Sequence, residues 1–119
     1  MKTENIKFKA KELGTGKWKE GFLQRDMDYN LCILIAKKEE HSWYWTQIDP
    51  STACMFTGLK DKNGTPIYEG DIVMHKDNNA ERRGDINWDS KAAAFCFGQD
   101  FLVHYHSEDM VVVGNKFDK

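Results

Sequence analysis

The sequence has little proline, little cysteine and no long apolar segment. Its 119 residues include two prolines and three cysteines. The longest apolar run covers residues 31–36, far short of the ~20 residues that a membrane-spanning helix needs. The first residues are not followed by an apolar stretch with a cleavage site, so the sequence predicts no secretory signal and a cytoplasmic location.

The sequence also lacks a catalytic signature. It contains no Gly-rich phosphate loop, no nucleophile elbow and no Cys-x-x-Cys pair. Cys32, Cys54 and Cys96 are far apart and have apolar neighbours, which predicts reduced, buried thiols. Cys96 or Ser107 could act as a nucleophile with a nearby histidine, but neither has an oxyanion-hole motif beside it. We therefore expect a protein that is not an enzyme.

Two histidines offer a weak metal-site signal. His104 and His106 are two residues apart on an expected strand, and a third ligand could come from His75, Cys96, Glu108 or Asp109. None of these stands at the spacing of a known metal motif, so we favour surface histidines and expect no metal and no cofactor. Residues 61–64 resemble a calcium loop only superficially, because the distal glutamate is missing.

The charge balance excludes a polybasic nucleic-acid binder. Seventeen basic and nineteen acidic side chains give a net charge of −2, with a pI near 6.1. Residues 1–20 are the exception, with six lysines against three glutamates. No segment has charge of one sign alone, so the sequence indicates solvated faces.

Alternating and β-branched stretches predict strands over most of the chain. We expect strands at residues 6–10, 29–36 and 42–48, the second of them buried on both faces. In the third, Trp43 and Trp45 share one face and Tyr44 lies on the other. Asn63-Gly64 predicts a tight turn, since both residues tolerate positive φ. The sequence leaves open whether a short helix forms near residues 19–28 or 37–41.

The second half predicts a small barrel. Five short antiparallel strands are expected between residues 70 and 113, including strands at 92–97 and 101–106. Gly70-Asp71-Ile72-Val73, a polar loop and a returning Gly-x-Ile strand are typical of SH3-like barrels. The predicted fold is mainly β, with N-terminal antiparallel strands (residues 1–62) packed on a C-terminal SH3-like barrel (residues 63–119) and one shared core.

The centre of the chain resembles a known family. Residues 56–64 (FTGLKDKNG) and 67–73 (IYEGDIV) are similar to the central signature of the YopX-like proteins, small proteins of bacteriophages and prophages. Residues 6–10 resemble that family's opening strand, and residues 113–115 its closing motif. The resemblance implies a β-rich phage-type protein in a bacterial host cell. It implies no activity, cofactor or catalytic residue.

Surface aromatics and basic residues are the candidate binding groups. They are Trp43, Trp45, Lys60, Lys62, Arg82, Arg83 and Trp88. Exposed tryptophans beside basic residues could stack on nucleic-acid bases, or they could form a protein-binding or self-association surface. The net negative charge favours protein binding, and nucleic-acid regulation is the alternative. At least one tryptophan could instead fill the core, and the arginine loop could be a plain solvated connector.

Overall fold

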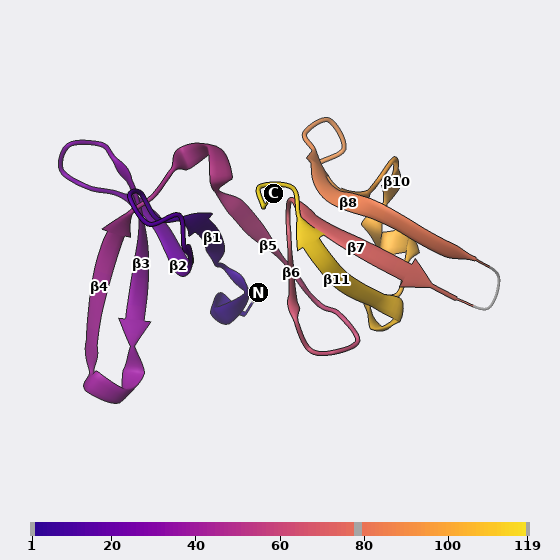
Figure 1. Ribbon diagram of the computed structural model, residues 1–119, viewed down its shortest axis with the longest axis horizontal. Coiled ribbons are helices and arrows are strands. Elements are labelled where there is room, and N and C mark those ends of the chain that lie inside the picture. Colours follow the sequence, from indigo (N-terminus) through magenta and orange to yellow (C-terminus); the bar gives the residue numbers. More distant parts are fainter. Residues whose placement is uncertain (1, 78–79, 119) are drawn as a thin grey trace. The chain divides into compact units, whose positions relative to one another are not determined.

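The computed structural model describes residues 2–77 and 80–118, and strands dominate it (Figure 1). The prediction of a mainly β protein is confirmed, and the helices of the described residues are short 3-10 turns. The chain divides into two compact units, Met1–Phe56 and Thr57–Lys119. The boundary expected from the sequence was after residue 62, six residues further along the chain.

The first unit is built from antiparallel strands. They are β1 (Phe8–Lys11), β2 (Trp18–Arg25), β3 (Leu31–Lys37), β4 (Ser42–Gln47) and the start of β5 (Cys54–Lys60). The sheet order is β4-β3-β2-β1-β5-β6, so β4 lies at one edge. Of the two places left open for a helix, residues 19–28 form strand and turn, and Lys38–Glu40 forms one 3-10 turn.

Gly21 lies where β2 changes partner. Residues up to Gly21 pair with β1, and residues from Phe22 onward pair with β3. A Cβ atom at Gly21 would overlap the carbonyl oxygen of Leu34. Only glycine lets the two backbones approach so closely, so this residue sets the path of the sheet.

A small hydrophobic core holds the first unit together. Its buried residues are Ala10, Ile33 and Ile48, surrounded by partly buried hydrophobic side chains. The expectation that residues 29–36 are buried on both faces is wrong for most of the strand. Cys32 and Ile33 are fully buried, but Leu34 is partly exposed and Ala36 exposed. The reason is that the core covers one face of β3, while the other face is open beyond Cys32.

The second unit contains the rest of β5 and six further strands: β6 (Pro66–Tyr68), β7 (Asp71–Lys76), β8 (Glu81–Asp89), β9 (Ala94–Phe97), β10 (Asp100–Phe101) and β11 (Met110–Asn115). Five of them form an antiparallel sheet in the order β10-β9-β8-β7-β11, and four of these, β7, β8, β9 and β11, correspond to strands expected there. Within the described residues β10 and β11 do not pair with each other. The sheet is therefore not closed, and the SH3-like barrel is not confirmed.

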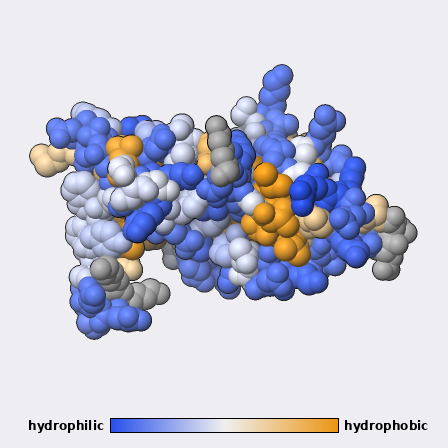
Figure 2. All heavy atoms as spheres, in the orientation of Figure 1, coloured by the Kyte–Doolittle hydropathy of each residue, from blue (hydrophilic) through white to orange (hydrophobic). Residues whose placement is uncertain are grey.

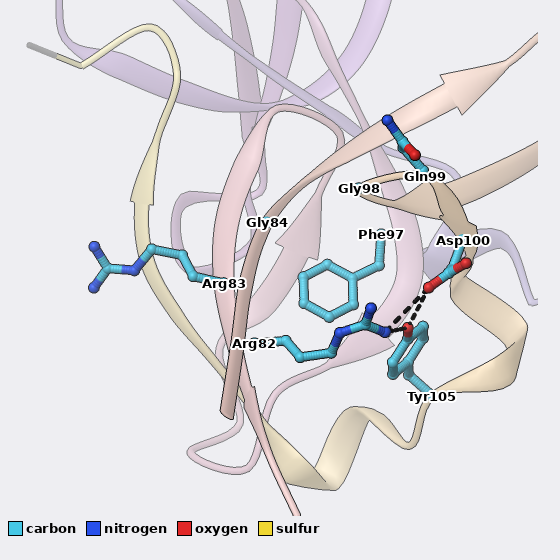
Figure 3. Close-up of a pocket in the computed structure, with 8 residues that line it drawn as sticks. All are labelled: Arg82, Arg83, Gly84, Phe97, Gly98, Gln99, Asp100 and Tyr105. Carbon is cyan, nitrogen blue, oxygen red and sulfur yellow. Dashed lines mark hydrogen bonds and ion pairs between the residues drawn. The ribbon is translucent and has the colours of Figure 1, made fainter. Parts of the chain in front are cut away.

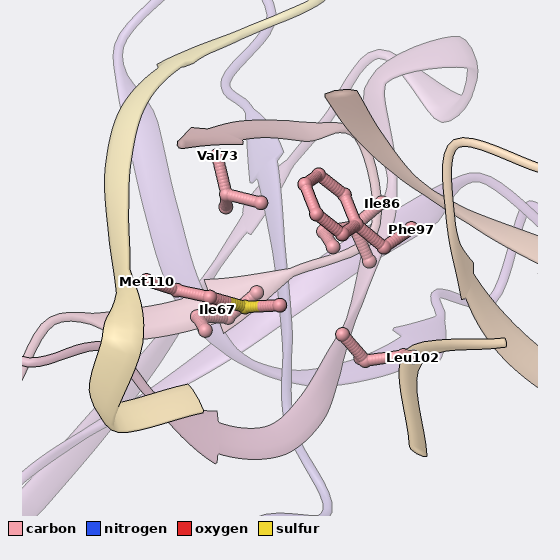
Figure 4. Close-up of a cluster of buried hydrophobic side chains, with 6 residues drawn as sticks. All are labelled: Ile67, Val73, Ile86, Phe97, Leu102 and Met110. Carbon is pink, nitrogen blue, oxygen red and sulfur yellow. The ribbon is translucent and has the colours of Figure 1, made fainter. Parts of the chain in front are cut away.

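The core of the second unit joins strands and turns. It contains Ile67, Val73, Ile86, Phe97, Leu102 and Met110, which converge in Figure 4. Gly84 makes room for Phe97, because a Cβ there would lie 2.9 Å from the ring. The aspartate of the Gly-Asp motif fixes the neighbouring turn: Asp71 accepts a hydrogen bond from the Tyr68 amide at 2.8 Å.

The strand expected at residues 101–106 is wrong. β10 ends at Phe101, and 3-10 turns follow at Leu102–His104 and Ser107–Asp109. Leu102 enters the core, while Val103 is 83% exposed. A 3-10 turn places residues i and i+3 on one side, so Leu102 and Tyr105 both face the core, which strand alternation would forbid.

The Asn63-Gly64 turn is confirmed. Gly64 has a φ of +80°, and its amide donates to the carbonyl of Asp61 at 3.0 Å. The Asp61 amide in turn donates to the carbonyl of Thr65 at 2.9 Å. The turn therefore closes as the two residue types allow.

Candidate binding surfaces

The β4 tryptophans lie on the surface. Trp43 is 65% exposed and Trp45 is 50% exposed. The register places Trp45 opposite Leu34 on β3, and Leu34 opposite Phe22 on β2. Because directly opposed residues share a face, these three side chains form one row on the outer face of the first sheet. Tyr44, on the other face, is 37% exposed.

The backbone of β4 is open along its outer edge. The Ile48 amide donates to the Leu31 carbonyl on the β3 side, at 3.1 Å. N–H directions alternate along a strand, so the amides of Trp43 and Trp45 point away from β3. The neighbouring outward carbonyl, that of Gln47, accepts from Leu13 at 3.0 Å. In the described part of the chain, no hydrogen bond takes up the outward groups of the two tryptophans.

The other sheet edges are short or covered. β6 has three residues and begins with proline, and β10 has two residues. Along β11, the Met110 carbonyl accepts from the Lys62 amide and the Val112 amide donates to Asp61. A register shift after Val112 interrupts the same edge. β4 also contains no charged residue and no proline, features that usually protect an edge.

Asp61 covers the β11 edge together with the Lys62 amide. It is buried, and its carboxylate accepts hydrogen bonds of 2.9 Å from the amides of Asn63, Thr65 and Val112. Burial favours the neutral form of this carboxyl group, but the three amides outweigh burial and lower the pKa of Asp61.

Arg82 belongs to a polar cluster beside a shallow pocket of about 270 Å³ in the second unit (Figure 3). Its guanidinium group binds the Asp100 carboxylate at 3.1 Å and also hydrogen-bonds the Tyr105 hydroxyl. The Tyr105 hydroxyl donates to Asp100 at 2.7 Å. Arg83 points away from this cluster, so the two adjacent arginines do not form one basic patch.

The same cluster changes the acidity of its members. The hydrogen bond from Tyr105, followed by that from Arg82, lowers the pKa of Asp100. The hydrogen bond to Asp100 raises the pKa of Tyr105, since the carboxylate opposes a second negative charge on the phenol. Arg82 is thus already paired, in contrast to a side chain held ready for a ligand.

The remaining predicted residues lie apart from one another in the second unit. Lys60 is exposed at the end of β5, and Lys62 lines a groove with Met74, Lys76, Glu108, Asp109 and Val111. Figure 2 shows hydrophobic side chains gathered over β11, whose Val113 is 44% exposed. Trp88 is 41% exposed and its ring meets Phe95 edge-on at 5.0 Å. Trp43 and Trp45 thus belong to the first unit, and the other predicted binding residues belong to the second.

Sequence reasoning missed a row of lysines in the first unit. Lys7 lies just before β1, and Lys9 and Lys11 lie within it at alternate positions; each holds its ammonium group over an aromatic ring. Two features of the sequence indicate this row of lysines: the alternation of residues 6–10 and the excess of lysine in residues 1–20. What the sequence did not show is that Trp18 and Phe56 lie under those lysines.

The histidines and thiols do not converge. His104 lies in a 3-10 turn, and His106 beside Glu108 at 3.8 Å. Across residues 2–77 and 80–118, no three histidine, cysteine or acidic side chains come together as a metal site. Cys32, Cys54 and Cys96 are buried thiols that form no disulfide among the described residues. No helix in the described ranges has the length and apolar character that crossing a bilayer requires.

These features define a two-unit antiparallel β protein with an exposed aromatic edge strand. The family model of the YopX protein matches residues 7–119. The chain therefore belongs to the YopX family. No curated protein and no solved structure matches the chain.

Proposed function

We propose that this chain is a non-enzymatic accessory protein of a phage or prophage that acts by self-association through β4. The observation that carries the proposal is the open edge of this strand, where two exposed tryptophans present backbone groups that take no hydrogen bond from the described residues. Such an edge is a template for pairing with another strand. The phage origin and the cytoplasm of a bacterial host rest on the family resemblance, and the non-enzymatic role on the lack of a catalytic motif.

The outward backbone groups favour one register for pairing with a second copy. An antiparallel two-fold pair centred on Tyr44 sets Trp43 of one copy opposite Trp45 of the other. The N–H and C=O groups of these residues then meet in four hydrogen bonds. All four indole rings gather on one face of the joined sheets, where aromatic pairs contribute beyond their buried area.

An SH3-like second unit would suit such a role. Support comes from the five-stranded antiparallel order and from the 3-10 turns just before the last strand. Small β domains of this kind commonly serve as binding modules, and their function depends on the surface they carry. Here the proposed surface is β4, in the first unit.

Sedimentation equilibrium over a range of concentrations tests the proposal. The wild-type chain should associate, and Trp45→Lys should weaken association at least ten-fold, because it places a charge among aromatic rings. Trp88→Lys is the matched control, the same change at an exposed tryptophan of the second unit, and should associate like the wild type. A wild-type chain that stays monomeric, or a loss shared equally by both variants, would contradict the proposal.

A further inference from the structure

The first unit carries a row of lysines seated on aromatic rings. The Lys7 ammonium lies 4.6 Å from the centre of the Phe56 ring. Those of Lys9 and Lys11 lie 4.9 and 5.4 Å from Trp18. Alternate residues of an extended chain point to one face and are about 6.8 Å apart, so the three charges form a ladder along β1 and the residue just before it.

The lysines are held in place by the rings below them. A cation over an aromatic face is attracted by about 0.5–1 kcal/mol at an exposed site. That attraction restricts a side chain that would otherwise lose much conformational freedom on binding a ligand. The ladder is therefore partly preorganised for a partner that carries regularly spaced negative charges.

An exposed aromatic ring stands beside the ladder. Phe22 lies on the same side of β2 as Trp18 and Glu20, and it is 49% exposed. Glu20 binds the Lys7 ammonium at 3.2 Å, which fixes these side chains on one common face. A flat ring next to a line of cations is the arrangement on which single strands stack a base while their phosphates follow the charges.

We infer that this face binds single-stranded nucleic acid, with Lys7, Lys9 and Lys11 along the phosphates and Phe22 against a base. The whole chain is acidic, so the positive charge is local to this region, where residues 1–20 hold six lysines against three glutamates. This charge complementarity favours a polyanion over an apolar protein surface. Phe22 shares the outer face of the sheet with Trp45, but it and the lysines lie outside β4, so the inference goes beyond self-association.

Fluorescence anisotropy with a labelled oligothymidylate at several salt concentrations tests this inference. The full-length chain should bind, and binding should weaken as salt rises. In a triple variant with Lys7→Gln, Lys9→Gln and Lys11→Gln, the slope of log K against log salt should fall by about 2, at ~0.7 for each phosphate contact. The double variant Lys60→Gln/Lys62→Gln in the second unit is the control and should keep the wild-type slope.

Two single variants keep the test decisive even if the triple variant fails to fold. Glu20→Gln removes a negative charge from the face and should tighten binding. Phe22→Ala should weaken binding about 5- to 150-fold without changing the salt slope, as loss of one stacked base requires. An unchanged affinity in both single variants would overturn the inference. So would an acidic peptide of equal charge that competes as well as the oligonucleotide.

Discussion

The carboxylate of Asp61 accepts a hydrogen bond from the backbone amide of Val112, 51 residues further along the chain, at a distance of 2.9 Å. This contact occupies an edge of β11 that could otherwise pair with another strand. The edge of β4 has no comparable side chain among the described residues. The protein thus covers one sheet edge with a buried aspartate and leaves another open beneath two tryptophans.

Replacing Asp61 should destabilise the second unit. Asp61→Ala removes three hydrogen bonds to an ionised group and leaves the amides of Asn63, Thr65 and Val112 without this acceptor. We expect a loss of about 2–4 kcal/mol in the free energy of unfolding, measured by chemical denaturation. Asp61→Asn should lose less, since its amide oxygen can still accept. Equal stability of wild type and Asp61→Ala would show that these hydrogen bonds contribute nothing.

Asp61 should also make the free energy of unfolding depend on pH. The pKa of Asp61 is lower in the folded state than in the unfolded chain, where it is about 3.9. Its stabilising contribution is therefore complete above the unfolded pKa and is lost as the pH falls through the folded pKa. Denaturation midpoints measured between pH 7 and pH 2 should fall less steeply in Asp61→Asn than in the wild type. Parallel curves for the two proteins would contradict the assigned role.

Gly21→Ala should disrupt the first unit. The added Cβ would overlap the Leu34 carbonyl oxygen, which is backbone and cannot rotate away. We expect a loss of about 3 kcal/mol or more, seen as a lower thermal midpoint by circular dichroism. Gly114→Ala is the control, since a Cβ there meets nothing within 4 Å. It should change stability by less than ~1 kcal/mol. Similar losses for the two variants would contradict the close approach of β2 and β3.

Tyr105 should ionise at higher pH than an ordinary tyrosine. The hydrogen bond to Asp100 raises the pKa of the Tyr105 phenol. In Asp100→Asn the phenol should titrate closer to pH 10, the usual value for tyrosine. Ultraviolet absorbance titrations of each protein, with Tyr105→Phe subtracted, isolate this residue. If Tyr105 titrates identically with and without the Asp100 charge, the hydrogen bond between these two side chains does not form in solution.

The three thiols should be unreactive in the native protein. Burial raises the pKa of the Cys32 and Cys96 thiols, and nearby aspartates raise it further. The thiolate is the nucleophile, so reaction with a coloured disulfide reagent at neutral pH should be at least ten-fold slower than in denaturant. A thiol that reacts at the same rate in the folded and unfolded chain would show that it is not buried.

Local sequence signals predicted the strands and turns well. Asn63-Gly64 forms its turn because both residue types accept the required backbone angles. Trp43 and Trp45 share a face because strand alternation is strictly local. The strand expected at residues 101–106 failed because the core demands Leu102 and Tyr105 on one side, and that demand comes from strands far away in the sequence.

The candidate sites were harder to predict than the fold. Arg82 and Arg83 are adjacent in sequence, yet Arg82 is bound to Asp100 and Tyr105, and Arg83 points away. The position of Phe56 under Lys7 depends on the pairing of β1 with β5, which joins residues about 50 positions apart. The spacing of residues along the sequence does not predict such long-range strand pairing.

Disulfide cross-linking at β4 tests the proposed self-association most directly. In the register centred on Tyr44, this residue faces its own copy across a non-hydrogen-bonded pair with a Cα separation of about 4.5 Å, within disulfide range. Under mild oxidation Tyr44→Cys should therefore form a covalent dimer. Thr46→Cys should not, because its two copies would lie about 13 Å apart along the strand. Equal cross-linking of the two variants, or none for Tyr44→Cys at concentrations where the wild type associates, would contradict the account.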